Sequence, residues 1–465
     1  MSGALDTADL PILELRHGSS YLHADCSIPM NADEIVHLSR RYTLYDWQAQ
    51  DNANPIPVDH AEGVYFYTPD GKRYLDFNSQ LMGVNIGHGD KRVIAAITRQ
   101  AEKLAYISPF MAHEARAVLG QKMAQILPGD IEKVFFTLGG AEANENAVRM
   151  ARAVTGRQKI LARYRSYHGS TSGAITLTGD PRRWPNEPGI PGVVHVLDPY
   201  HGLGRPVDSA ERSLTYLEET IQLEGPNTIA AFILEPVTGT NGILIPPDGY
   251  LKGVRELCDR YGIVMIADEI MTGFGRTGEW FAVNHWGVVP DIITMAKGLT
   301  SSYVPLGAVG IRPHIAEYFD KHVYFGGLTY NSHPLACAAA IATLDVYVED
   351  KLIEHSSQMG ELMGAHHQAL LRDHPSVAAV RNIGLFGVLE LVRDRTTMEP
   401  MAPFNGNSDE MRAFDRYLLD HGVYTMVRWW DVMTNPPLCI TEAELDEGFA
   451  VINEALAIAD KSVTT

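Results

Sequence analysis

The chain has few cysteines, in no arrangement that marks a disulfide-stapled or metal-bound protein. Its 465 residues include four of them, at Cys26, Cys258, Cys337 and Cys439, and none forms a CxxC pair. In so long a chain this argues against a disulfide framework and a structural zinc site, and favours a reducing compartment. We therefore predict no metal centre.

Targeting segments and basic clusters are also missing from the sequence. The first residues, MSGALDTADLPILELRHG, lack the basic stretch followed by an apolar stretch that a signal peptide needs. No apolar run approaches the roughly 18 residues that span a bilayer. The formal net charge of −19 disfavours nucleic acid, because phosphate backbones are bound by clustered Lys and Arg. We expect a cytoplasmic protein that binds neither membranes nor nucleic acids.

What is present is an alternation of short apolar strands with helical segments. The strands, rich in β-branched residues, are KVFFT, KILARY, VVHVL, IAAFILEPV, GIVMIADEI, DIITM and GAVGI. Helical spacing of apolar residues at 141–155, 208–223 and 249–261 separates several of them. This pattern is typical of a mostly parallel sheet covered by helices on both faces, so the predicted fold class is α/β.

The segments before this sheet predict helices and one hairpin. Apolar spacing favours helices over 31–45, 91–106 and 115–127. The stretch EGVYFYTPDGKRYLDF (62–77) predicts a β-hairpin with its turn at PDG.

The C-terminal part predicts a smaller α+β lobe. A long helical region follows residue 330, then AVRNIGLFGVLELV and helices at 408–421 and 441–459. A chain of this length exceeds the size of a single core. We therefore expect an N-terminal segment (1–75) that packs with the small domain (331–465), and a large domain (76–330) that carries the ligand site.

One glycine motif imitates a dinucleotide-binding fingerprint. GFGRTG (273–278) follows a strand, and Asp291 stands further along as the acidic residue would. However, Asp268 and Glu269 lie just upstream, where they would repel a pyrophosphate. EWFAVNHWG is an unconvincing helix, and the next strand arrives too soon for a complete βαβ unit. We do not favour a nicotinamide cofactor.

Polar residues gather where the predicted strands end. Ligands of open parallel sheets bind at the carboxyl ends of the strands. The polar and glycine-turn residues at those ends are Gly140, Ala141, Tyr167, His168, Glu235, Asp268, Glu269 and Lys297. Five strand ends are therefore expected to converge on one ligand site.

The segment LGGAEANENAVRMARAV (138–154) puts two glycines at the start of a helix. Free N–H groups and the helix dipole make such a start an anion cradle. Taken alone, a glycine turn with Glu142 complementing the dipole explains it better.

Asp268 and Lys297 are charges in apolar surroundings. A carboxylate at the end of GIVMIAD is costly without a cation, which is either a basic neighbour such as Arg276 or the protonated nitrogen of a pyridine ring. Lysine is almost never fully buried unless paired. Burial lowers its pKa and yields the neutral amine that a nucleophile requires, and the small neighbours Ala296 and Gly298 give a cofactor carbon room to approach. A buried acid, a buried amine and a phosphate cradle together fit pyridoxal phosphate.

Two further residues fit the ring of that cofactor. Tyr167, in the turn SYHGS, offers a ring that stacks on the pyridine, although core packing explains it equally well. Ile270 stands two residues past Asp268 on an extended chain, so it points to the same side and packs on the opposite ring face.

The chain resembles the class III, or ω-amino acid, pyridoxal-phosphate aminotransferases of fold type I over roughly residues 40–460. The motifs that carry the resemblance are GGAEANENA, YRSYHGS, ILEPV, IADEIMTGFGRTGEWFA, PDIITMAKGLTSSYVPLGAV, GLTYNSHPLACAAA and VRWWDVMTNPPLCIT. The resemblance implies that Lys297 is the Schiff-base lysine and Asp268 the partner of the pyridine nitrogen. Gly140 and Ala141 would bind the phosphate through backbone N–H groups, with Tyr167 stacked on the ring.

By the same resemblance, Thr329 reaches the phosphate of the other subunit's cofactor. The active sites would then lie at the interface of a homodimer, or of a dimer of such dimers. Two departures stand out. Gly139 and Ala141 replace serines that usually flank the phosphate turn, and Trp429 and Trp430 stand where smaller residues are common.

The substrate residues rest on the resemblance more than on the pattern. Arg428 matches a mobile arginine that pairs with a keto acid's carboxylate, although without the resemblance a surface arginine is the simpler reading. Trp47 and Phe110 match positions that line the substrate pocket, and packing explains both as well. The likeness is greatest to taurine–pyruvate and related ω-transaminases. It implies a terminal or simple amine as donor, such as taurine, β-alanine or an aliphatic or aromatic amine, and a keto acid, pyruvate first, as acceptor.

Two other hypotheses remain open at this point. The same scaffold hosts phospho-lyases, aminomutases and racemases, which share the cofactor and differ in the reaction. A protein that binds a nucleotide or small molecule without covalent chemistry at Lys297 is the third reading.

Overall fold

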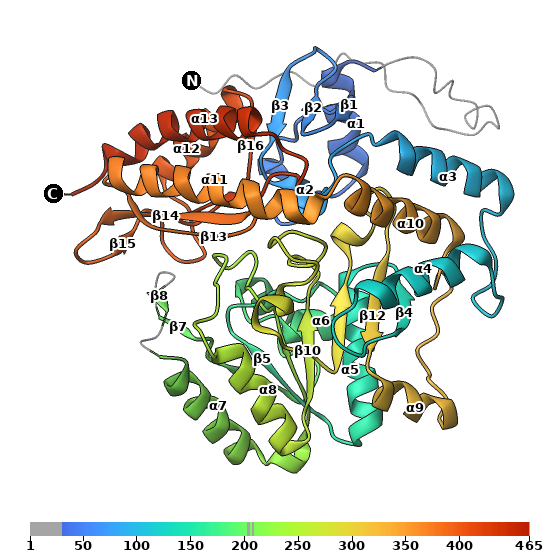
Figure 1. The fold of residues 1–465 in the computed structure, drawn as a ribbon. Coiled ribbons are helices and arrows are strands. Elements are labelled where there is room, and N and C mark those ends of the chain that lie inside the picture. The colour runs from blue at the N-terminus through green and yellow to red at the C-terminus, as the bar shows by residue number, and fades with distance from the viewer. Residues whose placement is uncertain (1–29, 202–204, 207–208, 465) are drawn as a thin grey trace. The chain divides into compact units, whose positions relative to one another are not determined.

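The computed structural model describes residues 30–201, 205–206 and 209–464 (Figure 1). Cys26 and the N-terminal stretch judged for a signal peptide lie outside these residues. The chain forms two compact units, one of residues up to 59 with 68–71, and one of 60–67 with the rest. In the first unit, helix α1 (Ala32–Tyr42) begins with a capping box, because Asn31 accepts from the N–H of Glu34 and Glu34 accepts from that of Asn31, both at 3.0 Å. A short 3₁₀ helix, η2 (Gln50–Asn52), follows.

The second unit contains the predicted sheet. Its strands in spatial order are β4 (Lys133–Thr137), β12 (Gly307–Ile311), β11 (Ile292–Met295), β10 (Val264–Asp268), β9 (Ile229–Leu234), β5 (Lys159–Arg163) and β6 (Val193–Val196). The strands from β11 to β6 pair in parallel, and β12 is antiparallel to β11 and β4. The prediction of a mostly parallel sheet is confirmed, as are all seven strand segments.

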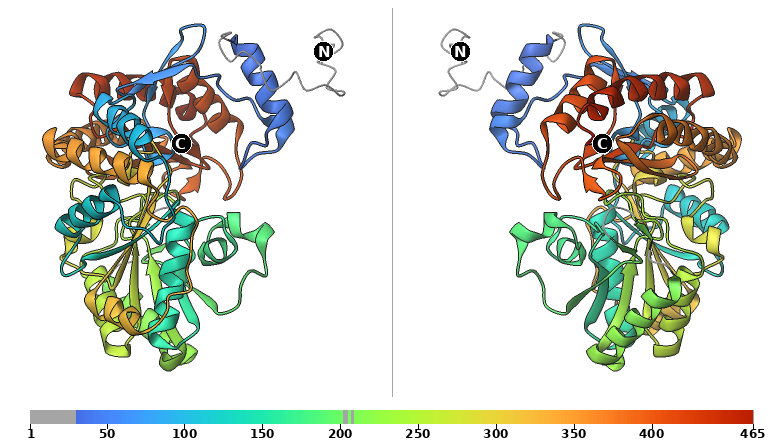
Figure 2. Two further views of the ribbon diagram at one scale, coloured as in Figure 1. Left: turned by 90° about the vertical axis from the view of Figure 1, so that its right-hand side faces the viewer. Right: turned by 90° about the vertical axis from the view of Figure 1, so that its left-hand side faces the viewer.

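Alternate residues of these strands enter two different cores. Leu161 and Met265 belong to the core shared with α4 (Glu114–Ile126), α7 (Ala210–Glu224) and α8 (Tyr250–Tyr261). Ile160 and Ile266 belong to the core shared with α5 (Gly140–Thr155), α6 (Ser172–Leu177) and α9 (Pro313–Lys321). The sheet therefore lies between two helical layers (Figure 2), which is why its strands are apolar on both faces.

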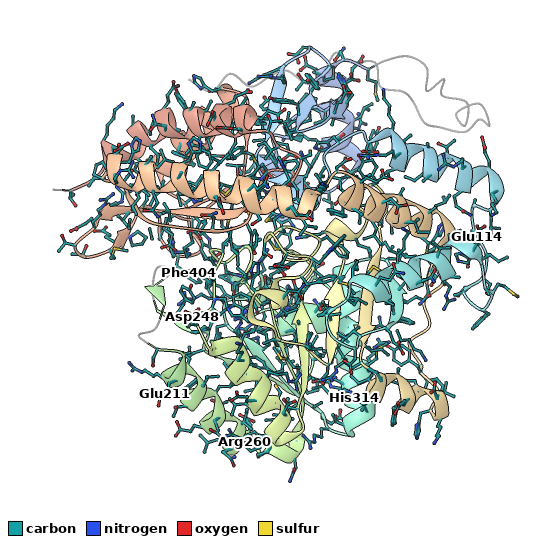
Figure 3. All side chains as sticks on the ribbon, in the orientation of Figure 1. Glu114, Glu211, Asp248, Arg260, His314 and Phe404 are labelled. Carbon is teal, nitrogen blue, oxygen red and sulfur yellow. The ribbon has the colours of Figure 1, made fainter. Side chains whose placement is uncertain are left out.

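Charged side chains mark the solvent side of these layers. Glu211 of α7 and Arg260 of α8 are exposed, and both lie at the outer edge of the molecule (Figure 3).

The C-terminal segments form a second sheet with its own helices. Its strands are β13 (Val377–Ile383), β14 (Phe386–Asp394), β18 (Asp431–Thr434) and β17 (Val427–Arg428), with β15 (Glu399–Pro400) beside β14. Helix α11 (Leu352–Asp373) packs on β13 and on α13 (Glu442–Asp460), which contacts α12 (Asp409–Asp420). The expected helices at 408–421 and 441–459 are confirmed.

The predicted hairpin forms a sheet with a strand from the C-terminal part of the chain. β2 (Tyr65–Tyr67) and β3 (Arg73–Asp76) pair across the PDG turn, β1 (His60–Glu62) pairs with β2, and β16 (Val423–Tyr424) runs parallel to β3. The remaining elements are α2 (Ser79–Met82), α3 (Lys91–Lys103), η3 (Pro181–Asn186), β7 (Tyr200–His201), β8 (Arg205–Pro206), η4 (Pro226–Thr228), η5 (Ala282–Trp286), η6 (Lys297–Leu299) and α10 (Pro334–Glu349). The domain boundaries at residues 75 and 330 stay a prediction.

The GFGRTG segment does not open a nucleotide-binding helix. The connection from β10 to β11 contains the short 3₁₀ helix η5 and no α-helix. Gly275 has a φ of +85°, and a Cβ there would lie 2.7 Å from Ile353 of α11. The glycine therefore serves a tight turn against α11.

No helix of the described residues is long and apolar enough to cross a bilayer.

Candidate active site

Lys297 follows the end of β11 and starts the short helix η6 in a left-handed backbone conformation. Its φ is +41°, which is uncommon for a residue with a side chain and is typical of functional sites. Packing also requires Gly298 to be small, whereas its role in leaving room for a cofactor stays a prediction. A Cβ there would lie 2.5 Å from the Asn85 amide and 2.9 Å from Phe274, so the missing side chain serves packing against these residues.

The amine of Lys297 is tuned toward its neutral form. Burial lowers the pKa of Lys297 to about 8, although the negative charges of Asp268 and Glu235 act in the opposite direction. The positive charge of Arg182 lowers it further. A lysine in this state supplies a reactive amine near neutral pH, as the sequence predicted.

Asp268 ends β10, the strand beside β11, and its carboxylate is held on both oxygens. Asp268 lies opposite Thr294 in the register of the two strands. Its Oδ2 accepts from Asn144 Nδ2 at 2.8 Å and lies 2.7 Å from His168 Nδ1, and its Oδ1 accepts from the backbone N–H of Ile270 at 3.1 Å. The carboxylate is only 3% exposed and therefore has a fixed direction. The strands that lead to Asp268 and Lys297 are therefore neighbours in the sheet.

Arg276, the alternative partner of Asp268, binds elsewhere. Its guanidinium donates to the carbonyl oxygens of Leu385 and Pro436 and to the side chains of Ser79 and Asn85. The ion pair of Asp268 with Arg276 is therefore wrong, and the basic neighbour in contact with Asp268 is His168.

Asn144 is a residue of this site that the sequence reasoning missed. It projects from α5, and its amide donates to the carbonyl oxygen of His168 at 2.8 Å as well as to Asp268. Its own carbonyl oxygen accepts from the Thr294 hydroxyl at 2.7 Å. Asn144 thus links two neighbouring strands to the turn that carries His168.

His168 contacts the side chain of Asp268, and Glu235 binds backbone N–H groups near the site. His168 is 2% exposed, and its Nε2 has no hydrogen-bond partner among the described residues. Glu235 accepts from the backbone N–H groups of Tyr167 at 3.0 Å and Gly239 at 2.8 Å, and burial raises the pKa of Glu235. Its observed contacts are to backbone, so its part in cofactor binding stays a prediction.

The ring of Tyr167 has a cationic neighbour that the sequence did not indicate. The Arg182 guanidinium lies 3.8 Å from the centre of that ring, a cation–π contact. Arg182 also donates to Asp180, with Nε 2.9 Å from Oδ2, and Asp180 Oδ2 accepts from Arg428 at 3.2 Å. This chain of contacts leads from Tyr167 to Arg428.

The N-terminus of α5 is not capped by a side chain, and its N-cap residue is Gly139. The first N–H groups of a helix have no partner within it, so those of Gly140 and Ala141 suit an anion. A Cβ on Gly140 would lie 2.6 Å from Cδ1 of Ile270, so Ile270 packs directly against this start.

Arg428 is part of a largely buried cluster. Its side chain is 16% exposed, its guanidinium lies 4.3 Å from the centre of the Trp429 ring, and burial lowers its pKa to about 10. The reading of Arg428 as a surface arginine is wrong.

The model of the aminotransferase class-III family matches residues 47–456. The chain belongs to the class III aminotransferase family. It therefore has the fold type I architecture of pyridoxal-phosphate enzymes and depends on that cofactor.

Similar class III enzymes and structures span nearly the whole chain. A putrescine–pyruvate aminotransferase of Pseudomonas aeruginosa is 34% identical and covers 88% of this chain and 96% of its own length. A taurine–pyruvate aminotransferase of Bilophila wadsworthia is 32% identical, with 92% and 98% covered. The structure of a taurine:2-oxoglutarate aminotransferase from Bifidobacterium kashiwanohense, in complex with PLP and glutamate, is 38% identical, covers 94% and 100%, and gives a TM-score of 0.90.

The residues of this class III aminotransferase fit pyridoxal phosphate. The uncapped start of α5 suits the phosphate, the fixed carboxylate of Asp268 suits a protonated ring nitrogen, and Lys297 supplies the amine. The buried Nε2 of His168, which has no partner among the described residues, marks a place where a polar group is missing.

Three predicted residues have no contact here that tests their roles. Thr329 and Phe110 line one surface pocket of about 470 Å³, where the Tyr106 hydroxyl donates to the Thr329 carbonyl oxygen at 3.0 Å. Phe110 is 93% exposed there. Trp47 belongs to the first unit and is 58% exposed. The substrate roles of Phe110 and Trp47 and the cofactor role of Thr329 stay predictions.

Proposed function

We propose that the enzyme moves an amino group from a terminal or simple amine to a keto acid, with pyruvate as the first candidate acceptor. The observation that carries this proposal is Lys297, whose pKa lies near 8 at a strand end beside the fixed carboxylate of Asp268. The names of the relatives support it, since they include taurine and putrescine as donors and pyruvate as acceptor.

Each of the residues at the site has a separate role in such a reaction. When bound, pyridoxal phosphate supplies a carbonyl carbon for the amine and a ring that withdraws electrons. Lys297 would hold the cofactor through its amine and would take the proton from the carbon beside the substrate nitrogen. Asp268 would pair with the protonated ring nitrogen, and Asn144 and His168 keep Asp268 in position.

Arg428 selects the acceptor in this proposal. Its guanidinium pairs with Asp180 at 3.2 Å. A keto acid's carboxylate offers the same acceptor geometry, so it exchanges for Asp180. A donor without an acidic group, such as an aliphatic amine, leaves the pair closed.

We also propose a homodimer in which Thr329 completes the partner's cofactor site. Its support is the exposed aromatic surface around Thr329, where Phe110 is 93%, Phe325 88% and Tyr330 51% exposed. Large exposed apolar patches mark interaction sites. For location we propose the cytoplasm, supported by the free thiols of Cys258, Cys337 and Cys439.

The experiment is a panel of amines, including taurine, β-alanine, aliphatic and aromatic amines, each with pyruvate and with 2-oxoglutarate. We expect alanine to form only when both amine and pyruvate are present. Release of ammonia or phosphate without an acceptor would instead support a lyase, and an isomerised amine an aminomutase.

A further inference from the structure

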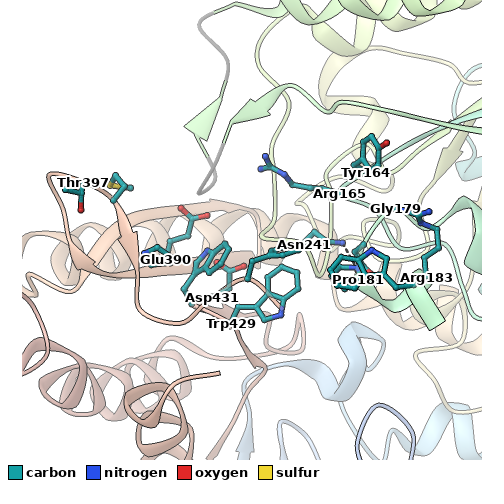
Figure 4. Close-up of a pocket in the computed structure, with 16 residues that line it drawn as sticks. Tyr164, Arg165, Gly179, Pro181, Arg183, Asn241, Glu390, Thr397, Trp429 and Asp431 are labelled. Atoms are coloured by element: carbon teal, nitrogen blue, oxygen red, sulfur yellow. Dashed lines mark hydrogen bonds between the residues drawn. The ribbon is translucent and has the colours of Figure 1, made fainter. Parts of the chain in front are cut away.

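A cavity of about 820 Å³ lies beside the Asp180–Arg428 pair. Its walls come from the segment around η3 and from β14, β18 and the loops beside them (Figure 4). Residues that line it include Asp180, Trp184, Glu390, Phe404, Trp429 and Asp431. Glu390 and Asp431 come from neighbouring strands at one side of this cavity (Figure 4). Two acidic side chains are therefore buried next to each other, which requires an explanation.

One face of the second sheet carries a row of four charged side chains. Glu390 of β14 lies directly opposite Asp431 of β18, and Asp431 lies directly opposite Arg428 of β17. On the other side of Glu390, Arg381 of β13 donates to its Oε1 at 2.8 Å. Residues paired directly across antiparallel strands have Cβ atoms about 4.5–5.5 Å apart. The row therefore has the two acids in its middle and an arginine at each end.

The two arginines of the row each pair with an acid other than Asp431. Arg381 pairs with Glu390 at 2.8 Å, and Arg428 pairs with Asp180 at 3.2 Å. Asp431 is therefore the surplus acid of the row. If it were ionised, it would be a buried negative charge directly beside another one, which is destabilising.

The unpartnered oxygen atoms of the two acids complement each other. Glu390 and Asp431 are 1% and 2% exposed, and neither Glu390 Oε2 nor Asp431 Oδ1 has a hydrogen-bond partner among the described residues. Two carboxylates offer only acceptors, so neither satisfies the other. A proton on one of them makes that group a donor, and the other stands directly opposite as its acceptor. One proton thus removes both the charge repulsion and the unpaired buried acceptors.

The surroundings of Asp431 favour its neutral form. Burial, followed by the negative charge of Glu390, raises the pKa of Asp431 well above its ordinary value. The positive charges that act in the opposite direction, without offsetting this, are those of Arg381, Arg428 and Arg165. Arg165, just past the end of β5, itself lies 3.5 Å from Asp198. The hydroxyl of Tyr200, whose pKa is raised by burial, adds no charge near Glu390.

The charge of Asp431 acts directly on Arg428, which binds the keto acid in the proposed function. An ionised Asp431 would place a second carboxylate opposite this guanidinium, in addition to Asp180. It would hold the guanidinium more strongly and would repel the carboxylate of an incoming keto acid. With a neutral Asp431, the keto acid has only Asp180 to replace. By linkage, the keto acid therefore binds most strongly while the row keeps its proton.

We infer that Glu390 and Asp431 share one proton at neutral pH, and that Asp431 is a positioning residue whose neutral state lets Arg428 bind a keto acid. The inference rests on the proposed function and adds to it a pH-dependent choice of acceptor. Asp431 stays neutral at low pH and ionises as the pH rises, when the proton leaves to solvent. This loss weakens the binding of acceptors with a carboxylate and does not affect acceptors without one.

The test compares pyruvate with acetaldehyde, in which a hydrogen replaces the carboxylate, as acceptors from the same amine with the holoenzyme. The ratio of their kcat/KM values is measured from about pH 6 to about pH 9, where buried carboxylic acids titrate. The titration of Lys297 affects both acceptors and cancels in this ratio. In the wild type, the ratio of pyruvate to acetaldehyde should fall by about fivefold or more as the pH rises, mainly through KM for pyruvate.

Two variants should change this ratio in opposite directions. Asp431→Asn is neutral at every pH, so its ratio should stay at the low-pH value of the wild type. Glu390→Gln cannot share the proton and leaves the positive charge of Arg381 to Asp431, which then ionises, so its ratio should be low throughout. A merely structural role would impair both acceptors alike and leave the pH dependence of the ratio in place. Glu399→Gln, at an exposed position of β15, is the control and should keep the wild-type profile.

Infrared spectroscopy detects the shared proton without any reaction. The difference spectrum between wild type and Asp431→Asn should contain the C=O band of a carboxylic acid, and this band should disappear as the pH rises. The inference would be overturned by the absence of this band at neutral pH, by a wild-type ratio that does not change with pH, or by a pH dependence that persists in Asp431→Asn. If no amine yields alanine but the band behaves as expected, the proposed function fails and the shared proton stands.

Discussion

The strand ends around Lys297 and the cavity around Trp429 differ in how fully their buried polar groups are paired. Glu235 has two hydrogen-bond partners, and Asp268 and Asn144 have three each. By contrast, Glu390 and Asp431 each keep one buried oxygen without a hydrogen-bond partner among the described residues. The first region also has such an atom, Nε2 of His168, but it is a ring nitrogen, whereas those of the second region are carboxylate oxygens.

The two regions also rest on different scaffolds. Asp268 and Lys297 end strands whose neighbours fix their positions through the sheet ladder. The cavity is built from short strands, the 3₁₀ helix η3 and loops, and Trp429 itself has a φ of +57°. Sites on regular elements hold their geometry better than sites on loops. Substitutions near Lys297 should therefore change the rate of the chemistry, and those near the cavity the choice of substrate.

The largest expected effect is that of Lys297→Ala. Loss of the amine removes both the cofactor anchor and the general base, so turnover should fall by at least about a thousandfold. Purified wild type should be yellow, and borohydride reduction should remove that absorbance band. The reduced cofactor should then be covalently attached to Lys297. Lys252→Ala, at an exposed position of α8, is the control. A Lys297→Ala enzyme with full turnover would end the catalytic assignment.

Asp268→Asn should be nearly as damaging to the chemistry. The neutral amide cannot stabilise a positive charge on the ring nitrogen, so kcat should fall on the order of a hundredfold. Stopped-flow measurement of the half-reaction with a single amine reports this step directly. Asp248→Asn, at an exposed position, controls for the charge. A change confined to KM would contradict the contrast between the two regions.

Arg428→Leu tests the other region. We expect KM for the keto acid to rise by about tenfold or more, because a charge-assisted pair with its carboxylate is lost. Steady-state kinetics with pyruvate varied at fixed amine measures it, with Arg260→Leu on the exposed side of α8 as control. If kcat of the amine half-reaction fell instead, Arg428 would belong with the Lys297 region.

Much of the Lys297 region could be predicted because short stretches of sequence are enough to mark its strands and the residues that follow them. Runs of apolar residues mark the strands, and the residue that follows each run is placed by the sheet. Asn144 was missed because its role arises only where α5 crosses β10 and β11. Arg182 and Asp180 were missed because the segment around η3 has no apolar periodicity, and its position depends on tertiary contacts. The packing role of Gly298 was missed because Asn85, which it packs against, lies far away in sequence.

Gly140→Ala tests how closely the phosphate cradle is packed. The new Cβ would lie 2.6 Å from Ile270 Cδ1, so the side chain or the helix start must shift. Overpacking of this kind costs about 1–3 kcal/mol, and we expect cofactor affinity to fall by about tenfold. Equilibrium dialysis of pyridoxal phosphate measures it. Gly139→Ala, where a Cβ has no neighbour within 4 Å, should lose less; an equal loss would show that packing is not the cause.

The smallest expected effect is a displacement of the pH dependence of cofactor capture. Because the pKa of Lys297 is lowered to about 8, its amine is protonated and unreactive below this pH and neutral above it. The rate at which apo-protein captures pyridoxal phosphate, followed by absorbance, should therefore rise with a midpoint near pH 8. Asp268→Asn removes a negative charge that raises the pKa, so its midpoint should move to lower pH. Arg182→Gln removes a positive charge that lowers the pKa, so its midpoint should move to higher pH. Opposite displacements would tie both neighbours to the lysine electrostatically, whereas a wild-type midpoint near the ordinary value of 10.5 would mean that burial does not tune the amine.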